Sequence, residues 1–513
     1  MSENRTFWQL VEARAEATPD ALCAVDERER RLDFAGYRDA ALRVAAALHA
    51  RGVGPGTPVS WMLPTTLEAM VLCAALARLG AVQNPILPIY RERETAFILD
   101  QTGARMVLVP PVFRGFDYAA MARALAAERD GLEVVVVEDA LPEAEPAGLP
   151  PAPPSAGLDD APVRWILYTS GTTADPKGAR HSDAGLIATF SGMARVLDLG
   201  PDDRHGMVFP ITHVGGVGWL VAGLVSGCAH LVVAAFDPTT TIPFLARHGV
   251  THAGAGTVFH QAYLAAQRAA PGRPIFPRIR SFPGGGAPKP PQLHHDLKRE
   301  LGGAGIVSGY GMTECPIIAM NRIGDPDEKL AATEGPANPP GMEIRIVRHD
   351  GARAGPGEEG EVRVRGPQLC RGYLDASLDA EAFDADGFFR TGDLGSLDAD
   401  GFVRITGRLK DVIIRKGENI SAQEIENLLY AHPKVADAAV IGLPDPALGE
   451  RCCAVVACRG GDPLGFEEMV EFLKAQRLAR QKIPEQLELV ESLPRNASGK
   501  IEKRALRDRF ARS

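Results

Sequence analysis

The segment Tyr168-Thr-Ser-Gly-Thr-Thr-Ala-Asp-Pro-Lys-Gly178 contains the residue types best suited to binding a chain of phosphates. Between Tyr168 and Gly178, four Ser or Thr hydroxyls, a glycine and a single lysine can surround polyphosphate oxygens. The pattern differs from a Walker A loop, which has Gly immediately before its Lys and Ser or Thr after it, whereas Pro176 and Gly178 flank Lys177. The alternative is a Ser/Thr-rich surface turn. The apolar run before the segment and its lone lysine favour a phosphate-binding loop.

Further glycine-rich corners follow along the chain, and their order and spacing matter more than any one of them. Glycine is common in turns, so each corner alone is a weak signal. They are Gly284–Pro288, Ser308–Glu314, Thr391–Asp393, Gly407–Arg408, Lys416–Glu418 and Asn496–Lys500. Together with the phosphate-binding segment, they make the chain resemble the adenylate-forming superfamily of acyl-CoA synthetases, nonribosomal adenylation domains and luciferases. The resemblance is highly specific and extends over essentially the whole length.

The resemblance implies an ATP site assembled from these corners. Lys177 and the segment before it would bind the β- and γ-phosphates, and Thr313 would bind a phosphate oxygen. Glu314 matches the residue that holds Mg²⁺, a hard cation that prefers oxygen ligands. The ring of Tyr310 would stack on adenine. The residues implied to bind ATP or AMP are Thr169, Ser170, Gly171, Thr172, Thr173, Gly286, Ala287, Pro288, Gly309, Tyr310, Gly311, Met312, Asp393 and Arg408.

The resemblance also implies a mobile C-terminal lid. Asp393 would accept both ribose hydroxyls, and Arg408 would lie beside ribose and phosphate. Lys410 occupies the hinge position of the family. Lys500 matches the lysine that bridges the acyl carboxylate and the α-phosphate, although a solvated surface charge is the usual role of a lysine near a C-terminus. The residues implied to line the channel for coenzyme A are Lys416, Gly417 and Glu418.

The implied reaction needs no covalent nucleophile on the protein, and the chain has no G-x-S-x-G elbow. A substrate carboxylate would attack the α-phosphorus of ATP, and pyrophosphate would leave. Mg²⁺, Lys500 and the phosphate-binding loop would neutralise the developing charge. The lid would then turn about Lys410, and the thiol of coenzyme A would attack the acyl-adenylate. The resemblance therefore predicts an AMP-forming acyl-CoA synthetase that uses ATP, Mg²⁺ and coenzyme A.

The acid must be inferred from the segment Phe209–Gly215. Relatives that activate amino acids have there an Asp that pairs with the α-amine, whereas this chain has Thr212 and His213. We therefore expect a carboxylic acid without an α-amine. The segment SWMLPTTLEAM and the stretch after it resemble medium-chain and alicyclic acid ligases, including cyclohexanecarboxylate–CoA ligases. The predicted acyl pocket consists of His213, Val214, Gly309 and Met312, with a core histidine as the alternative for His213.

Three alternatives remain open at this point. Ala174 stands where the family usually has Gly, and a positive φ there would strain Ala by about 1 kcal/mol. Slow adenylation would then leave an enzyme specialised for the thioester-forming half-reaction. A stand-alone domain that loads a carrier protein would accept the same pantetheine arm. A non-catalytic paralogue that binds acyl-adenylate is disfavoured, because Lys500 and Glu314 are both retained.

Composition excludes several other classes of protein. The 513 residues are 45% hydrophobic and 24% charged, as in ordinary globular proteins, and the net charge of −9 argues against a coat for nucleic acid. Eight scattered cysteines without a C-x-x-C pair indicate reduced thiols in a cytoplasmic protein, and no secretory signal is visible. The uncharged run 205–236 reads as a buried helix and strand instead of a membrane span. A homodimer is left open.

Hydrophobic patterns predict the elements that position these residues. β-Branched runs at 59–63, 81–86, 104–109 and 133–138 alternate with helical patterns such as 65–78, as in a parallel α/β fold. A second α/β series is expected from Arg164 to about Asn321, with strands near 164–169, 229–234, 279–282 and 304–308. A Pro/Ala/Gly-rich stretch at 141–162 reads as a linker. Ser421 and Glu424 have the spacing of a capping box before a helix that Pro433 ends.

The expected fold is α/β, with a large N-terminal domain and a small mobile α+β lid. The N-terminal acid- and ATP-binding domain is predicted to span residues 1–408. It would contain α/β subdomains at 1–160 and 163–330 and a β-rich, barrel-like subdomain at 331–408. The lid is predicted at 409–513.

Overall fold

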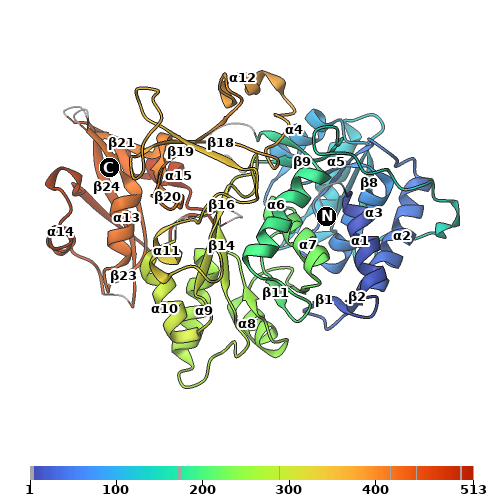
Figure 1. Ribbon diagram of the computed structural model, residues 1–513, viewed down its shortest axis with the longest axis horizontal. Helices are drawn as coiled ribbons and strands as arrows, with labels where there is room; N and C mark the ends of the chain where they lie inside the picture. Colours follow the sequence, from blue (N-terminus) through green and yellow to red (C-terminus); the bar gives the residue numbers. More distant parts are fainter. Residues whose placement is uncertain are drawn as a thin grey trace.

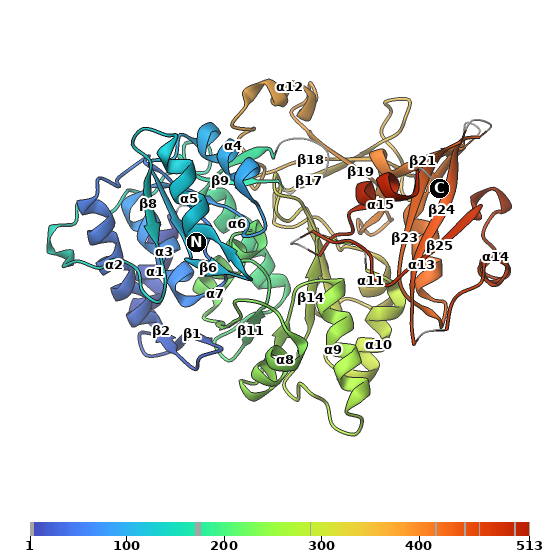
Figure 2. The same cartoon turned by 180° about the vertical axis from the view of Figure 1, so that it is seen from behind.

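The computed structural model describes residues 5–169, 176–287, 289–415, 418–445, 448–460, 462–496 and 499–511. The α/β architecture is confirmed, with a large N-terminal domain and a small C-terminal one (Figures 1 and 2). The blue N-terminal helices lie at one end of the molecule and the orange-to-red C-terminal domain at the other. No helix among the described residues is both long and apolar enough to traverse a lipid bilayer.

The first large sheet has six strands in the order β10-β9-β4-β3-β5-β8, and all but the edge strand β10 run parallel. Its strands read as apolar runs because helices cover both faces of a parallel sheet. Their bounds are β3 Pro58–Trp61, β4 Val82–Pro85, β5 Met106–Val109, β8 Glu133–Val136, β9 Val163–Tyr168 and β10 Gly178–Ser182. The neighbouring helices are α3 Leu67–Leu79, α4 Glu92–Thr102, α5 Tyr118–Ala127 and α6 Asp183–Val196, and α2 Phe34–Ala50 packs on α3.

A second sheet has the order β13-β11-β12-β1-β2, with β13, β11, β12 and β1 parallel. Its strands are β1 Leu22–Asp26, β2 Arg31–Asp33, β11 Arg204–Met207, β12 Ala229–Val232 and β13 His252–Ala253. The accompanying helices are α1 Phe7–Ala17, α7 Val214–Ser226, α8 Pro238–Arg247 and α9 Thr257–Ala269. The uncharged run 205–236 therefore contains the buried helix α7 followed by β12, as predicted, and also most of β11, which was not predicted.

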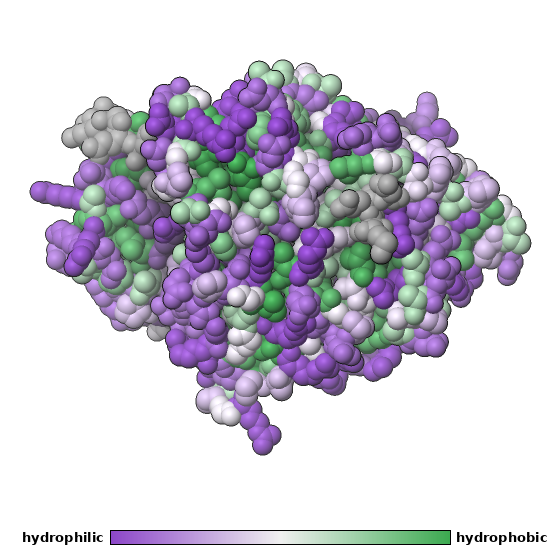
Figure 3. Space-filling view, in the orientation of Figure 1, coloured by the Kyte–Doolittle hydropathy of each residue, from purple (hydrophilic) through white to green (hydrophobic). Residues whose placement is uncertain are grey.

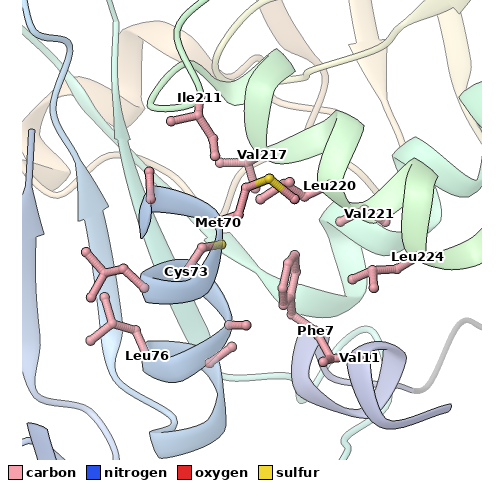
Figure 4. Close-up of a cluster of buried hydrophobic side chains, with 14 of the residues drawn as sticks. Phe7, Val11, Met70, Cys73, Leu76, Ile211, Val217, Leu220, Val221 and Leu224 are labelled. Atoms are coloured by element: carbon pink, nitrogen blue, oxygen red, sulfur yellow. The ribbon is translucent and has the colours of Figure 1, made fainter. Parts of the chain in front are cut away.

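The main core packs α1, α3 and α7 against one another (Figure 4). Met70 and Cys73 of α3 face a cluster from α1 and α7, which contributes Phe7, Val11, Val217, Leu220, Val221 and Leu224, while Leu76 extends the same core from another side of α3. Burying each such side chain contributes about 1.5–3 kcal/mol to the stability of the fold. This core fixes the N-terminal end of α7, where His213 lies.

A third, three-stranded sheet carries the glycine corners. It pairs β14 Phe282–Gly285 in parallel with β15 Ile306–Tyr310, and β15 with β16 Ala319–Met320. The strand expected near 279–282 thus lies three residues later. Ser281 forms only an isolated bridge to His252, whereas residues 282–285 pair with 306–309. Helices α10 Pro291–Leu301 and α11 Asp327–Ala332 border this sheet.

The β-rich part is an antiparallel sheet in the order β17-β18-β19-β20, with β17 Glu343–Val347, β18 Gly360–Arg365, β19 Phe389–Leu397 and β20 Val403–Arg408. The short helix α12 Asp379–Ala382 interrupts the connection from β18 to β19.

The C-terminal domain surrounds its own sheet, in the order β22-β21-β24-β23 with β25 beside β24. Its elements are β21 Val412–Arg415, β22 Glu418–Ser421, α13 Ala422–Tyr430, β23 Val435–Asp445, β24 Gly449–Cys458, α14 Phe466–Ala475, β25 Gln486–Val490 and α15 Lys503–Phe510. The predicted capping box is half formed. Ser421 accepts from the Glu424 amide, but the Glu424 carboxylate pairs with Lys482.

Hydrophilic residues predominate on the face seen in Figure 3. All eight cysteines are unpaired, and all but Cys458 are buried, in keeping with the expected reduced thiols. Cys452, Cys453 and Cys458 lie on β24, so packing accounts for them.

Candidate active site

The segment predicted to bind phosphate connects β9 and β10, which pair antiparallel. The Thr169 amide donates to the Lys177 carbonyl at 3.0 Å, and the Lys177 amide donates to Thr169 Oγ1 at 3.3 Å. These bonds close the mouth of the hairpin at the end of a buried parallel strand, where ligands bind in open α/β sheets. The side chain of Lys177 is exposed. Ser170, Gly171, Thr172, Thr173 and Ala174 lie outside the described residues.

Glycines shape the neighbouring corner because larger side chains would collide with backbone. A Cβ at Gly285 would lie 2.7 Å from the Gly309 carbonyl oxygen, and one at Gly311 would lie 2.1 Å from that of Pro316. Gly286 has a φ of 74°, which favours glycine. Ala287 follows it, whereas Pro288 is outside the described part of the chain. The predicted residues Gly286, Gly309 and Tyr310 therefore meet at paired strand ends.

Asp393 is buried and has both carboxylate oxygens engaged. The Tyr310 hydroxyl donates to one oxygen at 2.7 Å, and the guanidinium of Arg408 lies 2.9 Å from the other. Burial and the Asp393 charge raise the pKa of Tyr310 well above its usual range, so the phenol remains a hydrogen-bond donor. The structure thus brings together three residues predicted to bind adenosine, although Tyr310 meets Asp393 through its hydroxyl group.

Glu314 is 8% exposed and accepts a hydrogen bond from the Tyr373 hydroxyl at 2.5 Å. The ring centroid of Tyr373 lies 5.4 Å from the Lys177 ammonium nitrogen. Next to Glu314, the Thr313 carbonyl pairs with His181 Nε2 at 2.8 Å. Sequence reasoning missed Tyr373, which lies in the sequence Arg371-Gly-Tyr-Leu374. The one available signal was an aromatic residue next to a glycine.

Lys500 enters this site from the C-terminal domain. A Cβ at Gly286 would lie 3.7 Å from Lys500 Cε, so the side chain reaches the glycine corner. Burial lowers the pKa of Lys500 to about 8, with Arg408 and Lys410 lowering it further and Asp393 and Glu314 acting in the opposite direction. The predicted lysine therefore lies among the other predicted residues instead of in solvent.

A small hydrogen-bonded turn presents Lys500. Its amide donates to Asn496 Oδ1 at 3.0 Å, and the Gly499 amide donates to the Asn496 carbonyl. Arg495 donates to the Gly499 carbonyl and pairs with Asp437 at 2.6 Å. Arg495 and Asn496 are further residues whose support of Lys500 the sequence did not indicate.

His213 caps the N-terminus of α7, where its Nδ1 accepts from the Gly215 amide at 3.1 Å. Burial and then the nearby Lys500 lower its pKa to about 4, so the imidazole is neutral at pH 7. Its position near Lys500 separates it from an ordinary core histidine. Val214 is largely buried in the main core, and Met312 packs beside the β17–β20 sheet.

The residues predicted to form the hinge and the coenzyme A channel belong to the connection between the N-terminal and C-terminal domains. Lys410 lies in the short 3-10 helix Leu409–Asp411, between β20 and β21. The hydroxyl of Ser421 donates to the Thr406 carbonyl at 2.6 Å and ties β22 to β20. Lys416 and Gly417 lie outside the described residues, and Glu418 begins β22.

The donor set suits a magnesium ion that arrives with a nucleotide. Among the described residues, no group of three His, Cys, Asp or Glu side chains could hold a metal. Mg²⁺ typically binds one or two carboxylates together with substrate phosphates and several waters. The single carboxylate of Glu314, next to a phosphate-binding hairpin, fits that mode of binding.

Comparison with known proteins agrees with this geometry. The AMP-binding enzyme family matches residues 11–374, and the AMP-binding enzyme C-terminal domain matches residues 424–500. A salicyl-AMP ligase/salicyl-S-ArCP synthetase of Mycobacterium tuberculosis is 36% identical over 98% of this chain and 90% of its own. A medium-chain fatty-acid–CoA ligase of Escherichia coli is 32% identical over 98% of this chain and 89% of its own.

Solved structures give the same result. ATP-bound MatB from Rhodopseudomonas palustris superimposes with a TM-score of 0.86 at 28% identity, covering 100% of this chain and 99% of that one. The o-succinylbenzoate CoA synthetase of Bacillus subtilis, in complex with ATP and magnesium, has a TM-score of 0.81 at 28% identity and covers 99% of both chains. The chain therefore belongs to the AMP-binding enzyme family of the adenylate-forming superfamily and is an adenylate-forming acid ligase.

Proposed function

We propose that the protein is an AMP-forming acyl-CoA synthetase for a medium-chain, branched or alicyclic carboxylic acid without an α-amine. The observation that carries the proposal is the position of Lys500. Its side chain reaches the Gly286 corner, close enough to Glu314 and Asp393 for their charges to act on its pKa. A lysine that bridges carboxylate and α-phosphate has to lie there.

In the first step, a carboxylate oxygen of the acid attacks the α-phosphorus, the bond to the bridging oxygen breaks, and pyrophosphate leaves. Thr169, Lys177 and Thr313 bind phosphate oxygens in this proposal, and Glu314 holds Mg²⁺, which supplies charge neutralisation when bound. Lys500 stabilises the charge that develops between the two reactants. Positioned charges of this kind supply most of the rate acceleration in phosphoryl transfer.

In the second step, the lid turns about Lys410 and withdraws Lys500. The segment Lys416–Glu418 then lines the path of the pantetheine arm. The thiol loses its proton as its sulfur attacks the acyl carbonyl, and AMP leaves with its phosphate oxygen. Both steps thus use one pocket, and lid motion separates them.

The class of acid rests on the chemistry around α7. No carboxylate occurs in Phe209–Gly215 that could pair with an ammonium group. His213 is neutral and lies near Lys500, where it can face the acyl carbonyl. An α-ammonium group beside Lys500 would be repelled by it. These features support an acid whose carboxylate is its one charged group near the reacting centre.

The acceptor is proposed to be coenzyme A, with a carrier protein as the second candidate. The carrier protein is favoured by the 36% identical relative, whose name includes a salicyl-S-ArCP synthetase activity. The medium-chain fatty-acid–CoA ligase relative favours coenzyme A. Both acceptors end in a pantetheine thiol, so the lid chemistry is common to them.

The test is an acid panel scored by pyrophosphate release and by the mass of the thioester formed. The panel pairs medium-chain, alicyclic, aromatic and amino acids with either coenzyme A or a phosphopantetheinylated carrier protein. Release of pyrophosphate with alicyclic or medium-chain acids, followed by acyl-CoA formation, is expected. Turnover restricted to amino acids would overturn the proposed acid class, and thioester formed only on the carrier protein would overturn the proposed acceptor. Thioester formed only from preformed acyl-adenylate would indicate an enzyme specialised for the thioester-forming half-reaction.

A further inference from the structure

Tyr373 joins two parts of the phosphate site that come from different sheets. Its hydroxyl donates to Glu314 Oε1 at 2.5 Å, and its ring faces the ammonium of Lys177 with 5.4 Å from nitrogen to ring centroid. Glu314 lies beyond the end of β15, whereas Lys177 immediately precedes β10. One side chain, 3% exposed, therefore contacts the proposed magnesium ligand and the proposed phosphate lysine.

The backbone of Tyr373 is attached to the hairpin that carries Lys177. The segment 371–374 continues the six-stranded sheet beyond its edge strand β10, through an antiparallel bridge between Ala179 and Tyr373. The Arg180 amide donates to the Gly372 carbonyl at 3.1 Å, and the Leu374 amide donates to the Gly178 carbonyl at 2.7 Å. Any displacement of the start of β10 therefore moves Tyr373 with it.

Two further bonds fix Tyr373 from the other side. Its amide donates to Asp379 Oδ1 at 2.8 Å. The Cys370 amide donates to the Glu314 carbonyl at 2.8 Å, so the segment that holds Tyr373 also holds the backbone of Glu314.

We propose that Tyr373 is a positioning residue for adenylation, which orients the Glu314 carboxylate toward the metal–nucleotide complex and holds Lys177 in register with it. This inference rests on the proposed function of the site. A carboxylate held by one donor has one oxygen fixed and the other free to bind a cation. Outer-shell hydrogen bonds to metal-binding carboxylates typically affect metal affinity or activity by about 10–100-fold. The ring also supplies a cation–π contact to the exposed ammonium group of Lys177.

The test compares Tyr373→Phe with Tyr373→Leu. Tyr373→Phe removes the bond to Glu314 and keeps the ring, so it should raise the Mg²⁺ concentration for half-maximal pyrophosphate release by about 10-fold or more. Tyr373→Leu also removes the ring and should further raise the KM for ATP by about threefold. Both variants should form thioester from preformed acyl-adenylate and coenzyme A at the wild-type rate, because that step involves neither Mg²⁺ nor the outer phosphates.

Tyr37→Phe is the matched control, since it removes a buried tyrosine hydroxyl bonded to the Met70 carbonyl at 3.0 Å, away from the site. The binding measurement is a titration of Mn²⁺ by electron paramagnetic resonance in the presence of a non-hydrolysable ATP analogue. Weaker Mn²⁺ binding in Tyr373→Phe than in Tyr37→Phe supports the proposal. Equal Mn²⁺ affinity in the two variants would overturn it, as would an equal loss of both half-reactions together with a lowered Tm.

The two proposals fail in different ways. If the wild-type protein releases no pyrophosphate with any acid, the proposed function fails. The Mn²⁺ titration with the ATP analogue still decides the role of Tyr373, because it measures binding without turnover.

Discussion

Two lysines reach the proposed phosphate site, and the fold holds them in opposite ways. Lys177 is exposed at the mouth of a hairpin in the six-stranded sheet of the N-terminal domain. Lys500 is half-buried on a turn of the C-terminal domain, among Arg408 and Lys410, and its pKa is lowered to about 8. Its docked position is therefore electrostatically unfavourable until an anion arrives, whereas that of Lys177 is set by backbone pairing. The contrast suits a fixed phosphate ligand and a retractable catalytic group.

The largest effect should come from Lys500→Ala. Loss of the charge proposed to lie between acid and α-phosphate should slow pyrophosphate release by about 100–1,000-fold, comparable with removal of an oxyanion-hole donor. Thioester formation from preformed acyl-adenylate should be spared, because Lys500 is proposed to have withdrawn before that step. Lys474→Ala is the control, since Lys474 is exposed and pairs only with Glu471 among the described residues. Adenylation at the wild-type rate in Lys500→Ala would contradict the proposed catalytic role of Lys500 and its proposed difference from Lys177.

Lys177→Ala should act on ATP binding more than on turnover. A charge-assisted hydrogen bond to phosphate contributes about 1.5–3 kcal/mol, which corresponds to a rise in the KM for ATP of roughly 10–100-fold. Initial rates measured over a range of ATP concentrations separate KM from kcat. A fall in kcat with unchanged KM would show that Lys177 and Lys500 act in the same manner, and the proposed division between them would be wrong.

The pH dependence should distinguish the two lysines. Because the pKa of Lys500 is lowered to about 8, its charge is lost above that pH in the free enzyme, and kcat/KM for ATP should fall by about tenfold per pH unit. Lys177→Ala should keep this limb of the profile and Lys500→Ala should lose it.

The same titration changes the free energy of unfolding in the opposite direction, because stability should rise with pH while activity falls. Between about pH 8 and the unfolded value of 10.5, the unfolded chain binds a proton that the folded chain has lost, so the destabilisation caused by holding a charged Lys500 in the folded site is relieved as pH rises. The difference in Tm between Lys500→Met and wild type should therefore shrink as pH increases.

The smallest effect is expected for Arg495→Ala, which leaves Lys500 in place but loosens the turn that presents it. Arg495 connects the Gly499 carbonyl to Asp437, so its removal should slow adenylation by about 5–10-fold. Arg495→Lys should recover part of the rate through the pair with Asp437. If Arg495→Ala slowed thioester formation from acyl-adenylate equally, the residue would support the whole lid instead of the Lys500 turn.

Much of the fold could be predicted from the sequence because its signals are local. Apolar runs such as 104–109 and 133–138 contain β5 and β8, and the helix over 65–78 is α3 with its start two residues later. The strand at β14 was placed too early because Phe282–Gly285 contains two glycines and a proline, which disfavour strands. Pairing with β15 outweighs that local preference.

The candidate site likewise contains residues that could be predicted from the sequence and contacts that could not. Gly286, Glu314, Asp393, Arg408 and Lys500 come from separate segments, and the structure places them together as the resemblance implies. The contacts that support them could not be predicted. Tyr373 is 59 residues away from Glu314 in the chain, and no local pattern indicates that their side chains meet. The same holds for the link between Asp437 and the Lys500 turn.

The arrangement of Asp393 has a consequence for how a nucleotide would bind. Both of its oxygens already have partners, the Tyr310 hydroxyl and the Arg408 guanidinium. A ribose that reached Asp393 would therefore exchange hydrogen bonds instead of adding them, and the net enthalpy gained at this contact would be small. The exchange would release the guanidinium of Arg408 toward the phosphates. Sugar recognition would thus act as a trigger, which converts a resting internal ion pair into a cation available to the reaction.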